Sequence, residues 1–320
     1  MNEHFLTEIE ITQFKCFTCF KASGFKRVNL IGGKNNIGKT AFMEACYINV
    51  HSVNVDKILT AIINTKYSRE FLNIAAKIGS INDQRYLDSI ENYLAKSNLK
   101  NIEFAVVKKS GIKEYKVSVD NTDYVINANN LSIDANSIYN IMYIDNFGCD
   151  NGGLIRLYQA VQKQDQENQL NDYIYEFDNS IEIFKVIGDK PQCKTNGEYR
   201  DIVEFGDGLR HYISIICALY ACENGYLFID EIDNGIHYTQ LDRLWELILT
   251  LSKKINCQVF AVTHSKEMLE SFARVAEKLK EPDISYTLLV KNKQQEIKTI
   301  AMNYEVLLNS LAQEHEVRGW

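Results

Sequence analysis

The chain has 320 residues, of which 46% are hydrophobic and 24% are charged, and these values are ordinary for a globular protein. This length accommodates one large α/β domain, or a core domain that carries an inserted lobe. The net charge of −7 argues against a protein that coats nucleic acid through its overall charge, although it does not exclude a local basic groove.

The N-terminal sequence and the apolar runs argue against a secreted or membrane-spanning protein. The segment MNEHFLTEIEITQF is polar and mixed, unlike a signal peptide. The longest apolar run, around Tyr212 to Cys222, is too short to cross a bilayer. Cys217 and Cys257 stand inside apolar runs and are expected to be buried free thiols, which are typical of a reducing compartment. We therefore expect a cytoplasmic protein with no membrane partner.

The first half of the chain predicts strands, then a glycine turn and helices, then strands again. Residues 5–32 alternate or run apolar as strands do, and RVNLIGG reads as a short buried strand. The segment TAFMEACYINVHS after Lys39 is predicted to be helical. Residues 55–98 are expected to be helical and mostly polar, and residues 101–145 to form several strands joined by hairpin turns.

The second half predicts an alternation of helices and strands. Residues 153–187 are expected to return to helix, because Leu170, Ile174, Phe177, Ile181 and Phe184 form one apolar stripe at helical spacing. From about residue 200 the predicted elements are helix 209–222, strand 226–230, helix 239–254, strand 257–263, helix 266–279, two strands and a final helix.

This order of elements predicts an α/β protein with a mostly parallel sheet covered by helices and with antiparallel strands at the N-terminus. We assign residues 1–50 and 200–320 to the core. Residues 51–199 are expected to supply inserted helical and β segments that partly complete it.

The segment NLIGGKNNIGKT has the spacing G-x-x-x-x-G-K-[ST] between an apolar strand and a helix, which is the context of a P-loop. Glycines let backbone amides close around phosphate oxygens, and the helix N-terminus adds donors and a partial positive charge. We expect Lys39 to reach the β- and γ-phosphates of ATP and Thr40 to ligate Mg²⁺. The predicted phosphate-binding residues are Gly33, Lys34, Asn35, Asn36, Ile37, Gly38, Lys39 and Thr40.

A second apolar strand, Tyr226 to Ile229, ends in Asp230 and Glu231. In an open α/β sheet the C-terminal ends of strands face the ligand crevice. We therefore expect Asp230 to hold Mg²⁺ through water, and Glu231 to orient and polarise the attacking water. A further buried strand, CQVFAVTHS, ends at the same edge and is predicted to bring His264 to the γ-phosphate.

Together these segments resemble the ABC-type ATPase superfamily in its SMC/RecF-like and OLD-like (overcoming-lysogenisation-defect) branch. LTEIEITQFKCF and VNLIGGKNNIGKT are similar to the branch's opening strands and P-loop, LFIDEIDNGIH to its Walker B and D-loop, and VFAVTHS to its switch-histidine segment. The resemblance covers about residues 5–50 and 200–300. It implies an ATPase that uses ATP and Mg²⁺ and encloses two ATP molecules between two subunits.

The resemblance also implies a signature segment that acts on the partner subunit's ATP. At the expected spacing stands EFGDGLRHYISIICALY, with Gly206, Asp207, Gly208 and Arg210 where the signature helix begins. Gly206 replaces the signature serine, and Asp207 would repel phosphate unless it turns away. The helix N-terminus at Gly208 is expected to offer amides to the γ-phosphate. Asp233 in the D-loop is expected to act across the same interface.

The family's Q-loop glutamine has no obvious counterpart. The segment MYIDNFGCDNGG is the expected region but contains no glutamine, and Gln162 is the nearest candidate. Two further family features are not expected here. Residues 153–187 are too short for the long coiled-coil arm of SMC proteins, and the sequence leaves no room for the nuclease domain of full OLD proteins.

Two functions are compatible with these motifs. The first is a switch ATPase that dimerises or oligomerises around ATP and regulates a separate effector, such as a nuclease or toxin, in bacterial anti-phage defence or a toxin-type system. The alternative is a RecF-like DNA-repair or DNA-end-sensing ATPase, in which the lobe at 51–145, including KKSGIKEYK, contacts nucleic acid. A solvated charged hairpin is the favoured explanation of that stretch.

Overall fold

The computed structural model describes residues 5–51, 61, 103–109, 112–119, 122–129, 140–146 and 148–312, and only the backbone of the strands between 103 and 129. The segment 55–98, predicted to be helical, therefore lies almost wholly outside the described residues. The chain divides into two compact units. The first contains Met1–Thr7, Ser23–Met43 and Asn136–Trp320, and the second contains Glu8–Ala22 and Glu44–Ala135.

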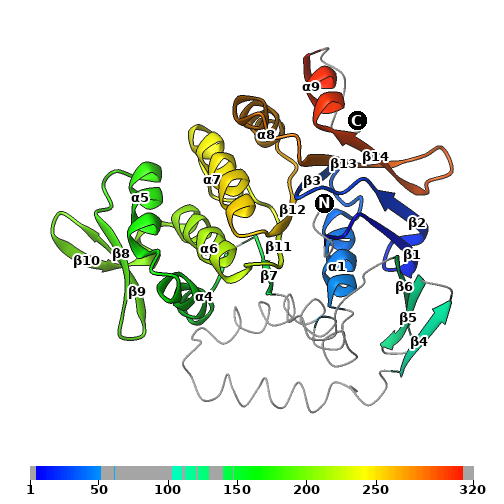
Figure 1. The fold of residues 1–320 in the computed structure, drawn as a ribbon, viewed down its shortest axis with the longest axis horizontal. Coiled ribbons are helices and arrows are strands. Elements are labelled where there is room, and N and C mark those ends of the chain that lie inside the picture. The colour runs from blue at the N-terminus through cyan, green and yellow to red at the C-terminus, as the bar shows by residue number, and fades with distance from the viewer. Residues whose placement is uncertain are drawn as a thin grey trace. The chain divides into compact units, whose positions relative to one another are not determined.

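The first unit is built on a six-stranded sheet in the order β14-β13-β3-β12-β11-β7 (Figure 1). Strands β13, β3, β12, β11 and β7 are parallel, and β14 pairs with β13 in the antiparallel sense. The strands are β3 (Val28–Gly33), β7 (Ile141–Ile144), β11 (Tyr226–Ile229), β12 (Gln258–Val262), β13 (Ile284–Lys291) and β14 (Ile297–Asn303). The predicted mostly parallel sheet is confirmed. Burial on both faces explains the unbroken apolar sequences of β11 and β12.

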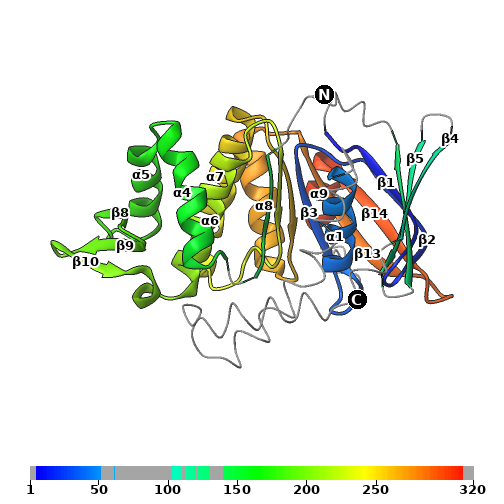
Figure 2. The same ribbon diagram turned by 90° about the horizontal axis from the view of Figure 1, so that it is seen from below.

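A row of helices covers one face of this sheet. They are α6 (Asp207–Ala221), α7 (Leu241–Lys254), which follows the short turn η3 (Tyr238–Gln240), and α8 (Lys266–Leu279). Figures 1 and 2 show α6, α7 and α8 side by side, and α9 (Tyr304–Ala312) packs on α8. Ser265 starts α8, because its Oγ accepts a hydrogen bond from the amide of Met268 at 3.1 Å. None of the described helices is long and apolar enough to cross a bilayer.

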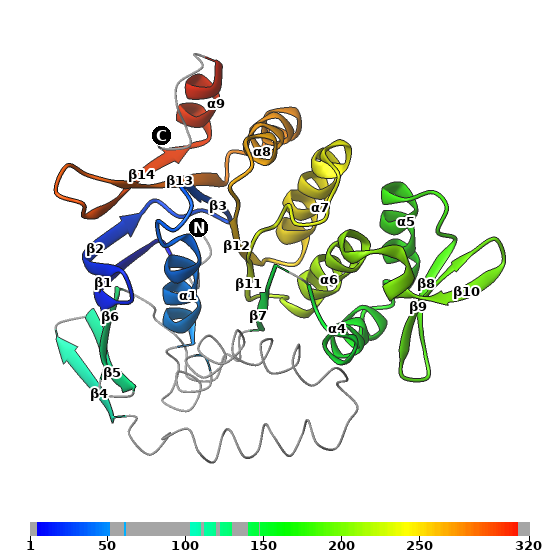
Figure 3. The same cartoon turned by 180° about the vertical axis from the view of Figure 1, so that it is seen from behind.

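Beside α6 lies a smaller group of elements, which Figure 3 shows from behind. It contains α4 (Asn151–Lys163), α5 (Glu167–Phe177), the strands β8 (Ile183–Ile187), β9 (Lys190–Thr195) and β10 (Glu198–Asp201), and the turn η2 (Ile202–Phe205). The three strands form an antiparallel sheet in the order β10-β9-β8. Helix α4 packs on both α6 and β9.

The single helix predicted over 153–187 is wrong in its second half. Helix α5 ends at Phe177, and Ile181 and Phe184 lie in a turn and in β8. Asp178 breaks the helix, because its Oδ1 accepts hydrogen bonds from the amide and hydroxyl of Ser180 at 2.9 and 2.7 Å. Both apolar residues beyond the break are fully buried, so the helical spacing of the stripe arose from two elements that share one core.

The second unit contains a five-stranded sheet in the order β2-β1-β6-β5-β4. Its strands are β1 (Glu8–Phe14), β2 (Phe17–Ser23), β4 (Glu103–Lys109), β5 (Ile112–Val119) and β6 (Thr122–Asn129), and the helix α1 (Lys39–Val50) begins in the first unit and ends in the second. Strands β1 and β6 pair in the antiparallel sense, as do β6 and β5, and β5 and β4. The predicted N-terminal antiparallel strands are therefore confirmed.

The strand before the glycine turn is fixed by its neighbours in the first unit. A methyl group on Gly32 would lie 2.1 Å from the phenol oxygen of Tyr286, so the tyrosine ring occupies the place of a side chain at position 32. Phe260 of β12 stacks on Phe228 at 5.3 Å and meets Phe25 edge-on at 5.4 Å. These contacts hold β3, β12 and β11 in register beneath the residues that follow them.

Candidate nucleotide site

The glycine loop joins the end of β3 to the start of α1. The backbone φ angles of Gly33, Asn36 and Gly38 are +141°, +60° and +105°. Residues other than glycine rarely adopt positive φ angles, and asparagine does so more often than most. A Cβ on Gly33 would also lie 2.7 Å from the carbonyl oxygen of Leu289. Of the other predicted phosphate-binding residues, Lys34 and Asn35 are exposed beside Asn36, whereas Ile37 is buried.

The Lys39 ammonium lies inside this loop. Its Nζ donates hydrogen bonds to the carbonyl oxygens of Gly33 at 2.8 Å and Lys34 at 3.0 Å, and the residue is only 6% exposed. Burial lowers the pKa of Lys39 from its ordinary value, and the negative charges of Asp230, Glu231 and Asp233 oppose that shift. An anion bound in the loop would further stabilise the charged ammonium.

The parallel pairing of β3, β12 and β11 brings the acidic strand end to the same edge of the sheet as the loop. Asp230 follows β11 and is 9% exposed, and the Thr40 hydroxyl donates to its Oδ1 at 3.3 Å. A hydroxyl and a carboxylate oxygen are the hard ligands that Mg²⁺ prefers, and Mg²⁺ usually takes only one or two protein ligands when it also binds phosphates. Thr40 and Asp230 therefore fit an Mg²⁺ ion that accompanies ATP.

Glu231 projects between two polar side chains. Its backbone has φ +47°, and its Oε1 lies 3.5 Å from Nε2 of His264. Its Oε2 lies 3.4 Å from Nδ2 of Asn146. His264 follows β12, so the acid and the histidine come from the ends of neighbouring parallel strands. The carboxylate is thus held at both oxygens without being buried.

Sequence reasoning missed Asn146. Strand β7 pairs with β11, and Ile144 lies opposite Ile229. Asn146 and Glu231 each follow this pair by two residues, so they leave the sheet at the same level. Gln162, the candidate from sequence, is instead exposed on α4. The available signal was a short carboxamide just after MYID, on the strand next to the acidic one.

Asp233 reaches the strand end that carries His264. Its Oδ1 accepts a hydrogen bond from the hydroxyl of Thr263 at 2.6 Å, and that hydroxyl also accepts from the amide of Ser265 at 3.0 Å. The next residue, Asn234, donates from Nδ2 to the carbonyl oxygen of Asn146. The turn after Glu231 therefore links the ends of β7 and β12.

The predicted signature residues gather elsewhere in the unit, around Gly235 and Asn151. Gly206 has φ +83° and precedes α6, whose first turn carries the exposed Asp207. Gly208 packs directly on Gly235, since a Cβ on Gly208 would lie 1.9 Å from the carbonyl oxygen of Gly235. Arg210 donates from Nη2 to Oδ1 of Asn151 at 2.6 Å, so its guanidinium is engaged with the start of α4.

Comparisons with known proteins agree with this architecture. Residues 151–269 match the family model described as "AAA ATPase domain". The chain is 26% identical to an "ATP/GTP phosphatase" of Helicobacter pylori, over 88% of this chain and 90% of the relative.

Two solved structures are similar in fold. A head domain of Smc bound to the C-terminal winged-helix domain of ScpA has a TM-score of 0.52 and 12% identity, over 95% of this chain and 99% of the other. The Smc head domain bound to the C-terminal domain of ScpA from Pyrococcus furiosus has a TM-score of 0.51 and 11% identity, over 97% and 99%. The fold of this chain is that of SMC head domains. Its match to an ATPase domain model and its likeness to an ATP/GTP phosphatase support hydrolysis of ATP by this chain.

Proposed function

We propose that this chain is a nucleotide-switch ATPase that closes as a dimer around ATP and Mg²⁺ and regulates a separate effector protein. The observation that carries the proposal is the gathering of Lys39, Thr40, Asp230, Glu231 and His264 at one edge of the parallel sheet. In this proposal the glycine loop and Lys39 hold the phosphates, and Thr40 and Asp230 hold Mg²⁺, which neutralises charge on the phosphates.

Glu231 is the group that we assign to the attacking water. Oxygen Oε2 is near the Asn146 amide and Oε1 is near the His264 ring, so the carboxylate is oriented by two neighbours. A carboxylate held in this way accepts a hydrogen bond from water and takes its proton as the water oxygen bonds to the γ-phosphorus, while the bond from that phosphorus to the β–γ bridging oxygen breaks and ADP leaves. His264 donates toward the γ-phosphate oxygens and stabilises the charge that develops there.

We assign the second half of each ATP site to the partner subunit. The start of α6, with Gly206, Asp207, Gly208 and Arg210, would face the partner's γ-phosphate, and Asp233 would lie at the same interface. Support comes from the contact of Gly208 with Gly235, which joins the helix start to the turn after Asp233. ATP bound between two subunits stabilises the dimer by mass action, and hydrolysis releases it.

The biological setting that we propose follows the OLD-like resemblance. We infer a cytoplasmic ATPase of a bacterial anti-phage or toxin-type system, whose effector is a nuclease or toxin. The described cysteines are free thiols, and Cys46, Cys193, Cys217, Cys222 and Cys257 are buried, which is compatible with a reducing compartment. We also propose that residues 1–50 and 200–320 form the ATPase core and that residues 51–199 are inserted helical and β segments that partly complete it.

The oligomeric state of three proteins tests this function. With ATP and Mg²⁺, we expect the wild type to form a transient dimer in light scattering, and Glu231→Gln to form a lasting dimer. We expect Lys39→Ala to bind no nucleotide, so that its oligomeric state does not change when ATP is added. Turnover in Glu231→Gln should fall by a factor on the order of 10² to 10⁴. Unchanged turnover in Glu231→Gln would show that Glu231 does not activate the attacking water. A wild-type protein whose oligomeric state does not change with ATP would refute the proposed switch.

The effector is tested by purification of the chain from cells that express its native operon. We expect a second protein to copurify, in an amount that depends on ATP. A preparation with no partner, together with no change of oligomeric state, would defeat the proposal.

The second candidate is a RecF-like ATPase that senses DNA. The observation that favours it is the basic sequence KKSGIKEYK, part of which lies in the antiparallel strands β4 and β5. Salt-dependent binding of duplex DNA and hydrolysis stimulated by DNA would support this candidate, and an absence of binding at low salt would exclude it.

A further inference from the structure

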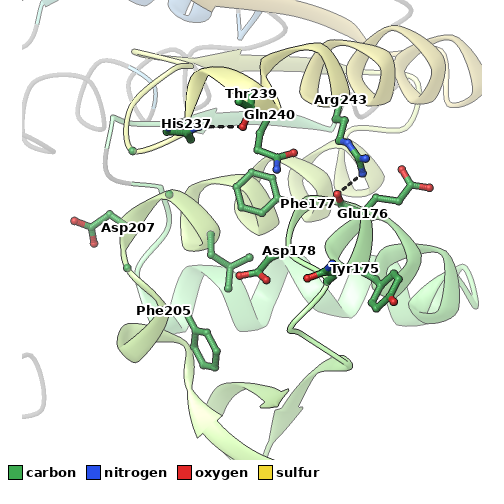
Figure 4. A pocket seen from close by; sticks show the side chains of 15 residues that line it. Tyr175, Glu176, Phe177, Asp178, Phe205, Asp207, His237, Thr239, Gln240 and Arg243 are labelled. Atoms are coloured by element: carbon green, nitrogen blue, oxygen red, sulfur yellow. Dashed lines mark hydrogen bonds between the residues drawn. The ribbon is translucent and has the colours of Figure 1, made fainter. Parts of the chain in front are cut away.

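A cavity of about 1000 Å³ opens beside the start of α6 (Figure 4), and its lining does not include Lys39, Glu231 or His264. Its walls come from three places: the end of α5 with the turn after it, the η2–α6 junction, and the segment from Gly235 to the first turn of α7. In Figure 4, Phe205 and Asp207 lie on the opposite side of the view from Arg243. All of these elements belong to the first unit.

The walls of this cavity are rich in acceptors. Three acidic residues, Glu176, Asp178 and Asp207, are among those that line it, together with one arginine, Arg243, and Asp178 lies at the centre of the view in Figure 4. The Arg243 guanidinium is already engaged, because its Nη1 donates to the carbonyl oxygen of Glu176. Oε1 of Gln240 is buried and accepts no hydrogen bond from any described group. Carboxylates and a buried unpaired acceptor call for a ligand that is cationic and donates several hydrogen bonds.

Exposed hydrophobic residues line this cavity or are close in sequence to residues that do. The three most exposed large hydrophobic residues among those described are Tyr238 at 69%, Val203 at 59% and Tyr175 at 55%. Tyr175 lines the cavity. In the sequence, Tyr238 lies between the lining residues His237 and Thr239, and Val203 lies two positions before the lining residue Phe205. Exposed aromatic side chains around a polar pocket are typical of protein–protein interfaces, in which tyrosine and arginine often dominate the binding energy.

We propose that this cavity is the docking site for a protein partner that inserts an arginine side chain. The proposal rests on the proposed function, because the partner is taken to be the regulated effector. Arginine suits the site better than lysine: its planar fork pairs with a carboxylate through two bonds, and its face stacks on an aromatic ring such as Tyr175. The net charge of −7 also favours encounter with a basic partner.

A partner bound in this cavity would contact the predicted signature segment. Gly206, Asp207 and Gly208 form part of its wall, and Gly208 packs on Gly235, which also lines it. An arginine seated between Asp178 and this wall would contact the start of α6. A partner bound there would therefore sense whether α6 is engaged with nucleotide.

Small arginine derivatives test the site without the partner. We would titrate acetyl-arginine amide, acetyl-lysine amide and acetyl-citrulline amide against the full chain, and measure binding by saturation-transfer NMR. Citrulline keeps the shape of arginine but has no charge. We expect arginine amide to bind about tenfold more tightly than citrulline amide, with lysine amide between them, and added salt to weaken the binding. Equal binding of the arginine and citrulline compounds would overturn the proposal, as would tighter binding of lysine.

The matched variants are Asp178→Asn and Asp172→Asn, which lie close together in sequence. Asp178 lines the cavity, whereas Asp172 is exposed on α5 outside it. Asparagine keeps the Oδ1 that accepts from Ser180, so the turn after α5 should survive. We expect Asp178→Asn to weaken arginine amide about tenfold and Asp172→Asn to leave it unchanged. Equal effects would overturn the proposal.

Turnover and ATP-dependent size of Asp178→Asn separate this inference from the proposed function. We expect both to match the wild type. Loss of the ATP dimer in this variant would assign the cavity to the contact between two copies of the chain and would overturn the inference. A wild type without turnover refutes the proposed function whatever the arginine titration gives. Normal turnover without arginine binding refutes the inference alone.

Discussion

Asn146 presents its amide to the same carboxylate that His264 approaches from the other side. Nδ2 lies 3.4 Å from Oε2 of Glu231, and the Asn146 carbonyl accepts from Asn234. The residue is thus held from both its backbone and its side chain at the proposed site of water activation. It lies in the segment MYIDNFGCDNGG, where the resemblance leads us to expect the Q-loop glutamine, and its side chain is one methylene shorter than that of glutamine.

We expect Asn146→Ala to lower kcat by about ten- to a hundredfold, because the loss of one aligned donor frees the Glu231 carboxylate to turn. Nucleotide affinity should change much less, since the loop around Lys39 is untouched. The measurement is steady-state phosphate release, together with the affinity for a labelled ATP analogue. Gln162→Ala is the control and should behave as the wild type. A larger effect at Gln162 than at Asn146 would reverse the assignment.

Residues of the site differ in how far sequence could locate them. The glycine loop is local: one strand, one turn and one helix start bring Gly33 and Lys39 together over six residues. Asp230 and His264 follow from a rule about the ends of parallel strands. Asn146 lies 85 positions from Glu231, and its place depends on the pairing of β7 with β11. No spacing in the sequence encodes that pairing.

At the scale of elements, the start of α6 depends on two glycines in contact. Gly208→Ala would place a methyl group 1.9 Å from the carbonyl of Gly235, and backbone cannot give way cheaply. We expect a loss of about 1–3 kcal/mol in the free energy of unfolding, measured in urea, and reduced turnover. Gly152→Ala is the control. It lies in the first turn of α4 with no contact under 3.6 Å, and should gain up to about 1 kcal/mol. Equal effects would show that the contact is unimportant.

The same helix carries a buried histidine that makes stability depend on pH. His211 is 1% exposed, and burial lowers its pKa to about 4, so the ring is neutral at pH 7. In the unfolded chain its pKa is about 6.5, so between pH 6.5 and 4 the unfolded state binds the proton and the folded state does not. Stability is complete above this window and falls as the pH is lowered through it.

His211→Phe removes this titration. The difference in unfolding free energy between wild type and variant should be constant above pH 7. Below pH 6.5 the wild type should lose unfolding free energy relative to the variant, by roughly 3 kcal/mol at pH 4. Urea titrations at several pH values measure it, and subtraction cancels the carboxylates that both proteins share. A difference that stays flat to pH 4 would contradict the burial of a neutral imidazole.

The periodicity of apolar residues predicted some helices and strands of this chain correctly and others not. The helices and strands after about residue 207 were predicted correctly, because the helices are long and amphipathic and the short strands β11 and β12 are unbroken apolar runs bounded by turns. Between 153 and 187 the same periodicity failed. Ile181 and Phe184 continue the apolar spacing of α5 but reach the core from a turn and a strand. The break at Asp178 depends on a side-chain hydrogen bond that competes with the helix.

At the scale of the whole molecule, a cluster of charges around the buried side chains of Arg27 and Glu281 joins three segments at the start of β3 in the first unit. Arg27, just before β3, donates to the carbonyl oxygen of Leu249 and pairs with Glu281 at 2.9 Å. Lys253 also pairs with Glu281, at 3.1 Å. Burial alone would raise the pKa of Glu281, but the Lys253 and Arg27 charges hold it below its usual value. The cluster joins the start of β3, the end of α7 and the segment before β13.

We expect Glu281→Ala to destabilise the protein by up to about 3–5 kcal/mol, because the buried Arg27 guanidinium keeps only its longer pair with the partly exposed Asp283, at 3.7 Å. Thermal or urea unfolding measures this loss. ATP affinity of the remaining folded protein should not change, since the glycine loop lies at the opposite end of β3. Glu296→Ala, which removes an exposed pair with Lys298, serves as the control and should leave unfolding unchanged. A Glu281→Ala protein as stable as this control would contradict the role of the cluster.

The division into units could not be inferred from sequence. Residues 8–22 belong with 44–135, whereas the segments on either side of them belong with the rest of the chain. This depends on β1 pairing with β6, in which Glu10 stands opposite Asn127. Antiparallel pairing between segments so distant in sequence leaves no local pattern, so the order of strands was beyond prediction even where each strand was foreseen.

The overlap of Tyr286 with the empty side of Gly32 has a consequence for the history of this protein. The two positions are separated by more than 250 residues, yet they share one volume, so neither can enlarge alone. An aligned set of descendants should therefore show paired exchange: wherever position 32 acquires a side chain, position 286 should hold a smaller one. Lineages that carry both an alanine at 32 and an aromatic residue at 286 should be missing from the record.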